Sequence, residues 1–216
     1  MKRILIILLI TTTIILMSCS HKKEKKGDKL EFKTLTVEEI AKVKEKVKNT
    51  EVIPVEDNEI AIIETKFGKM TIEFFTDEAP NHCANFKRLT NSGYYSGTTF
   101  HRVIPGFVIQ GGDINSRDDN KANDGMGGPG YNVDAEFNKI HHEKGILSMA
   151  RAQDPNSAGS QFFICAGDVG QLDNNYTVFG KVTDGLDVID KIVNLPRDER
   201  DNPNEPVNMK VTMKIK

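Results

Sequence analysis

The feature that most constrains this chain is a succession of short apolar runs, which begins after Asn58 and continues to the C-terminus. The runs are separated by connections rich in Gly, Asn, Asp and Pro. Each is long enough for a strand but too short for an ordinary helix. The first two runs begin at Ile60 and Met70, flank a turn that contains Gly68, and predict a β-hairpin. Six further strands are predicted at Thr99–Ile104, Phe107–Gln110, Ile146–Ala150, Gln161–Ala166, Thr177–Val182 and Val207–Ile215.

Helical spacing occurs in only two segments of this region. One begins at Pro80 and stops at Gly93, and the other covers Leu186–Val193. Many short strands with two helices predict a mainly β domain over residues 58–216, either a closed barrel or a sandwich. Hydrophobic residues make up 38% and charged residues 28% of the chain, which excludes a long coiled coil or a wholly disordered protein.

The N-terminus has the pattern of an export signal rather than of a folded element. A short basic segment precedes an uncharged apolar stretch, Ile4–Met17, which is too short to span a bilayer comfortably. The stretch ends in Leu16-Met17-Ser18-Cys19, which resembles the lipobox of bacterial lipoproteins. We therefore expect residues 1–18 to be a signal peptide. We expect lipid chains on Cys19 to anchor the mature protein to a membrane, facing the extracytoplasmic side of a bacterial cell envelope. A plain signal peptide with an incidental cysteine is the alternative.

Residues 19–57 are predicted to form a basic tether between this anchor and the β-rich domain. Residues 19–48 hold ten Lys and six acidic residues, although the net charge of the whole chain is -2. A solvated tether is favoured over specific contact with lipid headgroups. Thr36 and Glu39 have the spacing of a helical capping box, and apolar residues then recur at helical spacing, which predicts a short helix over about 37–48. The overall charge gives no reason to expect nucleic-acid binding.

The sequence lacks the common motifs of covalent, metal and nucleotide chemistry. It has no G-x-S-x-G, no H-E-x-x-H, no P-loop, and no G-x-G-x-x-G that follows a strand. The adjacent pair His141-His142 favours local hydrogen bonding over metal ligation, and the polar segment 113–130 is interpreted as a long surface loop without a calcium site. Cys83 and Cys165 fit buried small apolar positions. We therefore expect no metal and no cofactor.

Three segments point to one family. They are F-H-R-V-I-P-G-F at 100–107, G-S-Q-F-F-I at 159–164 and F-G-K-V at 179–182. In this order and spacing they resemble the cyclophilin family of peptidyl-prolyl cis–trans isomerases, and the resemblance covers about residues 58–216. It implies a closed eight-stranded antiparallel β-barrel capped by two α-helices. It also implies a monomer, proline-containing polypeptides as partners, and catalysis without a cofactor.

The resemblance also assigns roles to individual residues. It places the catalytic arginine on Arg102, with Phe107 and Gln110 completing the catalytic set. The substrate-binding positions that it implies are Val108, Ala150, Arg151, Ala152, Gln161, Phe163, Leu172 and Tyr176. Three of these depart from the common pattern, because Val108, Arg151 and Tyr176 stand where many members of the family have Met, Asn and His.

Without the resemblance, the role of Arg102 stays open between a structural ion pair, a charge at the rim of the domain, and catalysis. In a regular strand, Phe100, Arg102 and Ile104 share one face, while His101 and Val103 share the other. An arginine interleaved among apolar residues is unusual, because a charge near apolar surroundings needs a partner or a function.

Catalysis of rotation about an X-Pro bond requires little more than a hydrogen-bond donor beside an apolar pocket. Rotation is resisted by ~18–20 kcal/mol because the nitrogen lone pair is delocalised into the carbonyl. A twisted bond returns the lone pair to nitrogen, so a donor aimed there stabilises the twisted state more than the planar one. We expect an isomerase that assists the folding of extracytoplasmic polypeptides. The alternatives are a chaperone groove that holds proline-containing segments without turnover, and a lipoprotein whose barrel is only structural.

Overall fold

The computed structural model describes residues 30–216, so the predicted signal peptide at 1–18 and the predicted lipid attachment at Cys19 lie outside the described residues. Within this range the chain forms three α-helices and eight β-strands. The helices are α1 (Val37–Lys48), α2 (Pro80–Asn91) and α3 (Leu186–Val193). The strands are β1 (Glu59–Thr65), β2 (Gly68–Phe74), β3 (Phe100–Ile104), β4 (Val108–Gly111), β5 (Ile146–Met149), β6 (Phe162–Cys165), β7 (Val178–Asp184) and β8 (Lys210–Ile215). No described helix is long and apolar enough to cross a bilayer.

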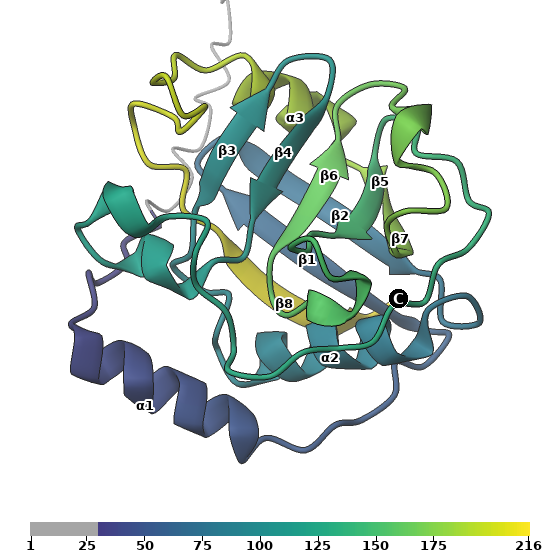
Figure 1. The fold of residues 1–216 in the computed structure, drawn as a ribbon, viewed down its shortest axis with the longest axis horizontal. Helices are drawn as coiled ribbons and strands as arrows, with labels where there is room; N and C mark the ends of the chain where they lie inside the picture. Colours follow the sequence, from purple (N-terminus) through teal and green to yellow (C-terminus); the bar gives the residue numbers. More distant parts are fainter. Residues whose placement is uncertain (1–29) are drawn as a thin grey trace, which may run out of the picture.

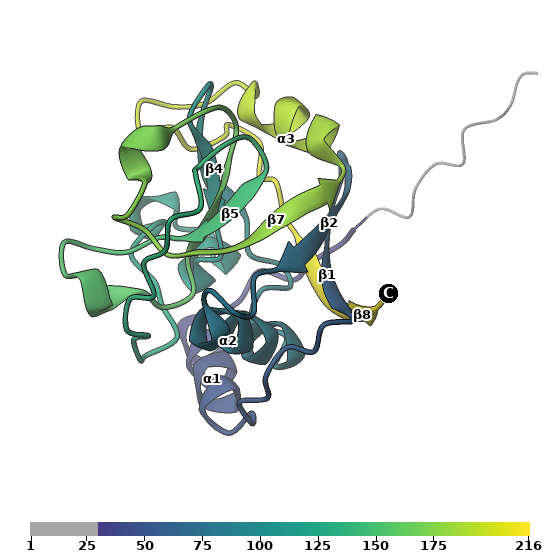
Figure 2. The ribbon, with the colours of Figure 1, turned by 90° about the vertical axis from the view of Figure 1, so that its right-hand side faces the viewer.

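The strands form one antiparallel sheet in the order β3-β4-β6-β5-β7-β2-β1-β8. This sheet curves around the main apolar core, and α2 and α3 lie at its opposite ends (Figures 1 and 2). Each strand begins and ends within one or two residues of its predicted limits, except that β8 begins at Lys210 rather than at Val207. The mainly β architecture with two end-capping helices is therefore confirmed.

The predicted closure of the barrel was wrong. β3 and β8 are the two edges of an open sheet. The segments that precede them are joined by an isolated bridge between Thr99 and Asn208 and by backbone hydrogen bonds between residues 97–100 and 207–209. The reason is that a loop occupies the free edge of β3, where the Val103 amide donates to the Asp201 carbonyl at 2.8 Å. An edge covered in this way is protected from pairing with another chain, although no eighth ladder closes the sheet.

The predicted helix in the tether is confirmed as α1, and it packs on the domain. Thr36 and Glu39 form the expected capping box, with the Glu39 amide donating to Thr36 Oγ1 at 3.3 Å and the Thr36 amide donating to Glu39 Oε2 at 3.0 Å. Ile40 and Val47 are buried in the main core. The predicted partition into a tether and a domain stays a prediction, but α1 itself is part of the folded body.

An arginine on α2 fixes the C-terminal end of α1. Arg88 Nε donates to the carbonyls of Val47 at 2.9 Å and Thr50 at 2.8 Å, and Arg88 Nη2 donates to the Lys48 carbonyl at 2.8 Å. The last carbonyls of a helix have no partner within the helix, so a cation placed there satisfies them and also interacts favourably with the helix dipole. The two helices lie side by side at one end of the sheet (Figures 1 and 2).

Strands β4, β5, β6 and β7 have apolar side chains on both faces. Ile109, Leu147, Phe162 and Ile164 point into the main core. Alternate residues of the same strands, together with Val169 from the loop after β6, form a second apolar cluster on the outer face. Its buried strand residues are Val108, Ile146, Phe163, Cys165 and Val178. This explains why these runs are almost uninterrupted in the sequence, since a strand that is covered on both sides has no solvent-facing positions to alternate.

The predicted strand alternation around Arg102 was wrong at Phe100. The pairing of β3 with β4 shifts between Phe100 and Arg102, which leaves His101 as the extra residue of a bulge. A bulge reverses the side on which the following residues lie. Phe100 therefore joins Val103 in the main core, whereas Arg102 and Ile104 are half-buried on the other face.

We predict that Arg88→Ala detaches the end of α1. The Val47, Lys48 and Thr50 carbonyls would lose their charged donor, so the free energy of unfolding should fall by about 1–3 kcal/mol. Hydrogen exchange of the α1 amides should become faster, and denaturant unfolding would measure the stability. Lys42→Ala, an exposed cation on the same helix, is the matched control. Unchanged protection of α1 in the Arg88 variant would contradict this account.

Candidate active site

Sheet register brings residues from three strands into one row. Arg102 on β3 pairs with Gln110 on β4, and Gln110 pairs with Phe163 on β6. Directly paired residues place their side chains on the same face, with Cβ atoms about 4.5–5.5 Å apart. A guanidinium, an amide and an aromatic ring therefore lie side by side on the outer face of the sheet.

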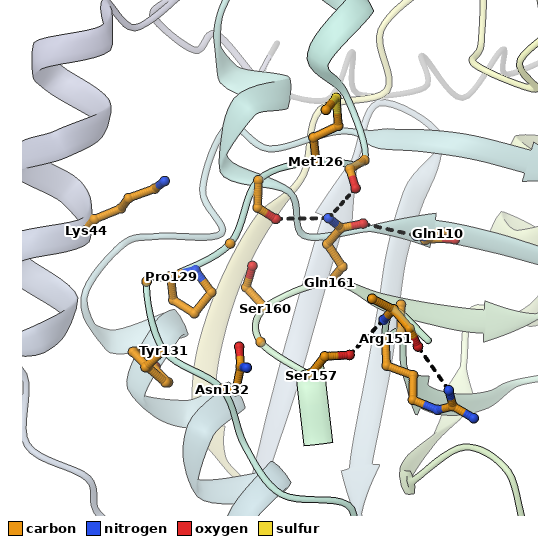
Figure 3. A pocket seen from close by; sticks show the side chains of 17 residues that line it. Lys44, Gln110, Met126, Pro129, Tyr131, Asn132, Arg151, Ser157, Ser160 and Gln161 are labelled. Atoms are coloured by element: carbon orange, nitrogen blue, oxygen red, sulfur yellow. Dashed lines mark hydrogen bonds between the residues drawn. The ribbon is translucent and has the colours of Figure 1, made fainter. Parts of the chain in front are cut away.

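A chain of hydrogen bonds orients the polar part of this row. Arg102 Nη1 donates to Gln110 Oε1 at 3.2 Å, and Gln110 Nε2 donates to Gln161 Oε1 at 3.0 Å. The Gln161 Nε2 group then donates to the Gly125 and Gly127 carbonyls, each at 2.9 Å (Figure 3). Each amide accepts on its oxygen and donates from its nitrogen, so the directions along the chain are mutually consistent.

The segment 113–130, predicted as a surface loop, anchors the far end of this chain. It contains the two short 3-10 turns Ile114–Arg117 and Lys121–Asn123, and its first residue, Asp113, is fully buried. The Asp113 carboxylate accepts from the Asn115 amide at 2.8 Å and from the Gly127 amide at 3.1 Å. The prediction of a loop was right, but the prediction that it lies only on the surface was wrong.

An apolar cluster lies beside the polar row on the outer face of the sheet, and we call it the slot. Its buried members include Val108 and Phe163, and half-buried apolar residues pack against them. Phe163 and Tyr176 meet edge to face with ring centroids 5.6 Å apart. The predicted residues Phe107, Val108, Ala150, Phe163, Leu172 and Tyr176 all belong to this cluster. Such a surface can hold a small apolar ring, because it removes that ring from water.

Arg151 borders the slot with its guanidinium held in place. Its Nε and Nη2 atoms donate to the Asn175 carbonyl at 3.1 and 2.9 Å, and Nη1 donates to the Ala152 carbonyl at 2.9 Å. The guanidinium carbon also lies 4.8 Å from the centre of the Tyr176 ring. The backbone amide of Ala150 donates to the Gln161 carbonyl, and the backbone amide of Ala152 donates to Ser157 Oγ. Tyr176 and Arg151 thus form one stacked unit at the rim.

Ser148, His142 and Asp173 resemble a hydrolytic triad in connectivity, but they serve the structure. His142 Nε2 lies 3.1 Å from Ser148 Oγ, and His142 Nδ1 lies 2.8 Å from Asp173 Oδ1. Ser148 and His142 are completely buried, and the Ser148 hydroxyl donates to the Thr177 carbonyl at 2.9 Å. His142 also stacks on Phe163 at 6.0 Å. The group therefore supports the floor of the slot, since a nucleophile must be reachable by its substrate.

The expected hydrogen bonding of the histidine pair is confirmed. His141 binds Asp168 through Nε2 at 3.0 Å and Asp173 through Nδ1 at 2.7 Å. The two carboxylates raise the pKa of His141, whereas burial lowers the pKa of His142. Residues 30–216 contain no group of three or more His, Cys, Asp or Glu that could hold a metal ion.

The two cysteines of the domain are buried, as predicted, and neither forms a disulfide. Burial raises the pKa of both Cys83 and Cys165 to about 12. A thiol with so high a pKa holds almost no thiolate at neutral pH, so neither residue is an activated nucleophile. Cys165 instead forms part of the slot floor, which its spacing in the sequence did not indicate.

The structure brings the predicted site residues of the domain together around the row, with Ala152 placed next to it by its contact with Arg151. The three polar residues Arg102, Gln110 and Gln161 form the hydrogen-bond chain, and the others form the slot or its rim. Sequence reasoning missed the loop carbonyls that orient Gln161, because a backbone acceptor carries no signature in the sequence. It also missed several apolar contributors to the slot, namely Phe75, Ile140, Ile146, Cys165, Val169 and Val178.

Comparison with known families gives one consistent result. The chain matches the family of cyclophilin type peptidyl-prolyl cis-trans isomerases/CLD over residues 60–213. A probable peptidyl-prolyl cis-trans isomerase of Brucella abortus is 46% identical over 136 residues, which cover 61% of this chain and 69% of that protein. A peptidyl-prolyl cis-trans isomerase of Schizosaccharomyces pombe is 41% identical over 152 residues, which cover 68% of this chain and 93% of that protein.

Solved structures agree with the sequence comparisons. A cyclophilin type isomerase of Cryptosporidium parvum, solved in the presence of the dipeptide ala-pro, is 37% identical with a TM-score of 0.65. The match covers 73% of this chain and 98% of that chain. A cyclophilin of Hirschia baltica is 29% identical with a TM-score of 0.60, and the match covers 76% of each chain.

We predict that acidification from about pH 7.5 to about pH 5.5 destabilises the domain. Burial lowers the pKa of His82, His101 and His142 in the folded state, so the unfolded chain binds more protons below its ordinary histidine pKa of about 6.5. Their stabilising contribution is present above that value and is lost as the pH falls. His141 has a raised pKa and acts in the opposite direction.

Urea unfolding at the two pH values measures this effect. The midpoint should be lower at the acidic pH, and His141→Gln should make the loss larger because it removes the opposing group. A midpoint that stays level or rises on acidification would show that the buried histidines do not control the stability.

Proposed function

Because the chain belongs to the cyclophilin family of peptidyl-prolyl cis–trans isomerases, we propose that it catalyses X-Pro rotation at the row formed by Arg102, Gln110 and Phe163. The observation that carries this assignment is the juxtaposition of an oriented arginine donor and an apolar slot on one face of the sheet. Arg151 also borders the slot, but its Nε, Nη1 and Nη2 atoms all donate to backbone carbonyls.

Arg102 stabilises the twisted state of the bond in this proposal. The prolyl nitrogen of a planar X-Pro bond is a poor acceptor, because its lone pair is delocalised, and it becomes an acceptor as the bond twists. A fixed N–H donor at that position binds the twisted state more strongly than either planar state, which lowers the barrier. The barrier of ~18–20 kcal/mol is otherwise crossed in tens of seconds.

The neighbouring residues support this single interaction. Gln110 holds the guanidinium through a neutral amide, so the positive charge is oriented without being cancelled by a carboxylate. The slot that contains Phe107, Phe163 and Leu172 grips the pyrrolidine ring and removes water, while the remaining chain rotates. The step needs no proton transfer, nucleophile or cofactor.

We further propose that the substrates are extracytoplasmic polypeptides with slow X-Pro bonds, and that the enzyme assists their folding while held to a membrane by lipid on Cys19. The support is the sequence pattern of residues 1–19, in which a basic segment and an uncharged apolar stretch precede the cysteine. A tethered isomerase would stay concentrated where exported chains emerge and fold.

Substitution of the proposed donor should abolish most of the activity. We expect Arg102→Ala to lower kcat/KM by about 10²–10³-fold, as for the loss of one transition-state donor. Arg102→Lys keeps the charge but loses the planar donor geometry, so it should also be strongly impaired. NMR exchange on an X-Pro peptide measures the rate without a coupling protease.

The matched control is Lys69→Ala, which removes an exposed cation that pairs with Glu64 on the β1–β2 hairpin, on strands that do not carry the row. Its kcat/KM should equal that of the unsubstituted chain. Undiminished activity in Arg102→Ala, with the fold intact by circular dichroism, would refute the mechanism.

The anchor predicts a change in cellular distribution. In the bacterium, Cys19→Ala should abolish incorporation of labelled palmitate and move the protein from the membrane fraction to the soluble fraction. Ser18→Ala, which leaves the cysteine in place, should keep both properties. Labelling that persists in the Cys19 variant would refute lipidation at this residue.

A further inference from the structure

A cavity of about 680 Å³ lies next to the catalytic row, and no role has yet been assigned to it. Gln110 and Gln161 belong to both, so a peptide bound at the row has its neighbouring residues at the mouth of the cavity. Its lining includes Met126 and Pro129 from the loop 113–130, and also Ala150 and Ser157. Successive residues of an extended peptide are about 3.3–3.6 Å apart, so one or two residues suffice to reach it.

The charged side chains that line this cavity are all positive. Its lining includes the cations Lys44 and Arg151 and contains no Asp or Glu. Lys44 extends from α1 toward the cavity, and Arg151 lies on the opposite side (Figure 3). A cavity lined in this way raises the local concentration of anionic groups.

The two cations differ in what they are free to bind. The Arg151 guanidinium is held by the carbonyls of Ala152, Gln153 and Asn175. Lys44 has no hydrogen bond or ion pair to any residue in the range 30–216, although its neighbours Glu45 and Lys48 pair with each other. The Lys44 ammonium is therefore the available donor at the cavity.

The position of Lys44 is fixed by the way α1 packs. Val47, one turn away, is fully buried, and Arg88 holds the carbonyls that follow it. At the other end of the helix, the Leu35 amide donates to the Arg117 carbonyl at 2.8 Å. A donor on a helix held at both ends is better positioned than one on a flexible tether.

Resting on the proposed function, we propose that α1 makes the isomerase selective for an acidic side chain near the proline, which enters the cavity and binds Lys44. A glutamate fits best, because its methylenes can contact Met126 and Pro129 while its carboxylate reaches the ammonium. Helix α1 lies outside residues 60–213, where the chain matches its family, so this selectivity is supplied by an element added to the common domain.

The test compares peptides that differ at one position. An Ala-rich peptide with a central Ala-Pro bond carries Glu or Gln at each of the positions within three residues of the proline on either side. NMR exchange with the full chain in neutral detergent gives kcat/KM for each peptide. We expect one position at which Glu exceeds Gln by about two- to fivefold, since a partly exposed ion pair has a modest effect. Salt should reduce this ratio.

Variants assign the preference to Lys44. Lys44→Gln should bring the Glu/Gln ratio to about one, Lys44→Arg should preserve it, and Lys44→Glu should invert it. Lys46→Gln, which removes an exposed cation of the same helix that does not line the cavity, should leave the ratio unchanged. The ratio is measured within each variant, so a general loss of activity does not affect it.

The outcomes separate this inference from the proposed function. Equal rates for Glu and Gln peptides at every position, with normal turnover of both, would overturn the inference and leave the isomerase intact. A preference that survives Lys44→Gln would also overturn it. Loss of binding to vesicles of anionic lipid in Lys44→Gln, with an unchanged peptide ratio, would assign the residue to the membrane instead.

Discussion

The site depends on one register, in which β4 pairs on one side with β3 and on the other with β6. That register sets Arg102, Gln110 and Phe163 in a row. A slip of one residue would move every side chain of β4 to the opposite face, so Gln110 would enter the core and the guanidinium would lose its partner. The bulge at His101 is part of the same constraint, because it turns Arg102 outward while Phe100 remains inside.

The sheet serves two purposes because its central strands are apolar on both faces. The inner residues fill the main core, and the outer residues form the floor of the slot. Such a floor can hardly move, since each outer side chain is flanked along its strand by core residues packed at high density. The residues of the slot are therefore held in position by the core beneath them.

Two elements outside the sheet complete the site. The segment 113–130 supplies the carbonyls that orient Gln161, and it is itself held by the buried Asp113. Helix α1 brings Lys44 to the neighbouring cavity. The helix is held on the domain by the hydrogen bonds of Arg88 and by the burial of Val47. In both elements the position of the group matters more than its type. The loop contributes backbone carbonyls, which every loop has, and the helix contributes a lysine, which is a common residue in this chain.

The sequence by itself determined the local elements and the residue types of the site. Pro80 and the Thr36–Glu39 pair marked helix starts through short-range capping chemistry, and the apolar runs marked strands. The motifs around Arg102 and Gln161 indicated the family, which the comparisons confirmed. Tertiary structure alone decided the open edge between β3 and β8, the bulge that sorts Phe100 from Arg102, and the packing of α1. These features depend on contacts between residues far apart in the chain, and no local pattern of hydrophobicity or spacing encodes such contacts.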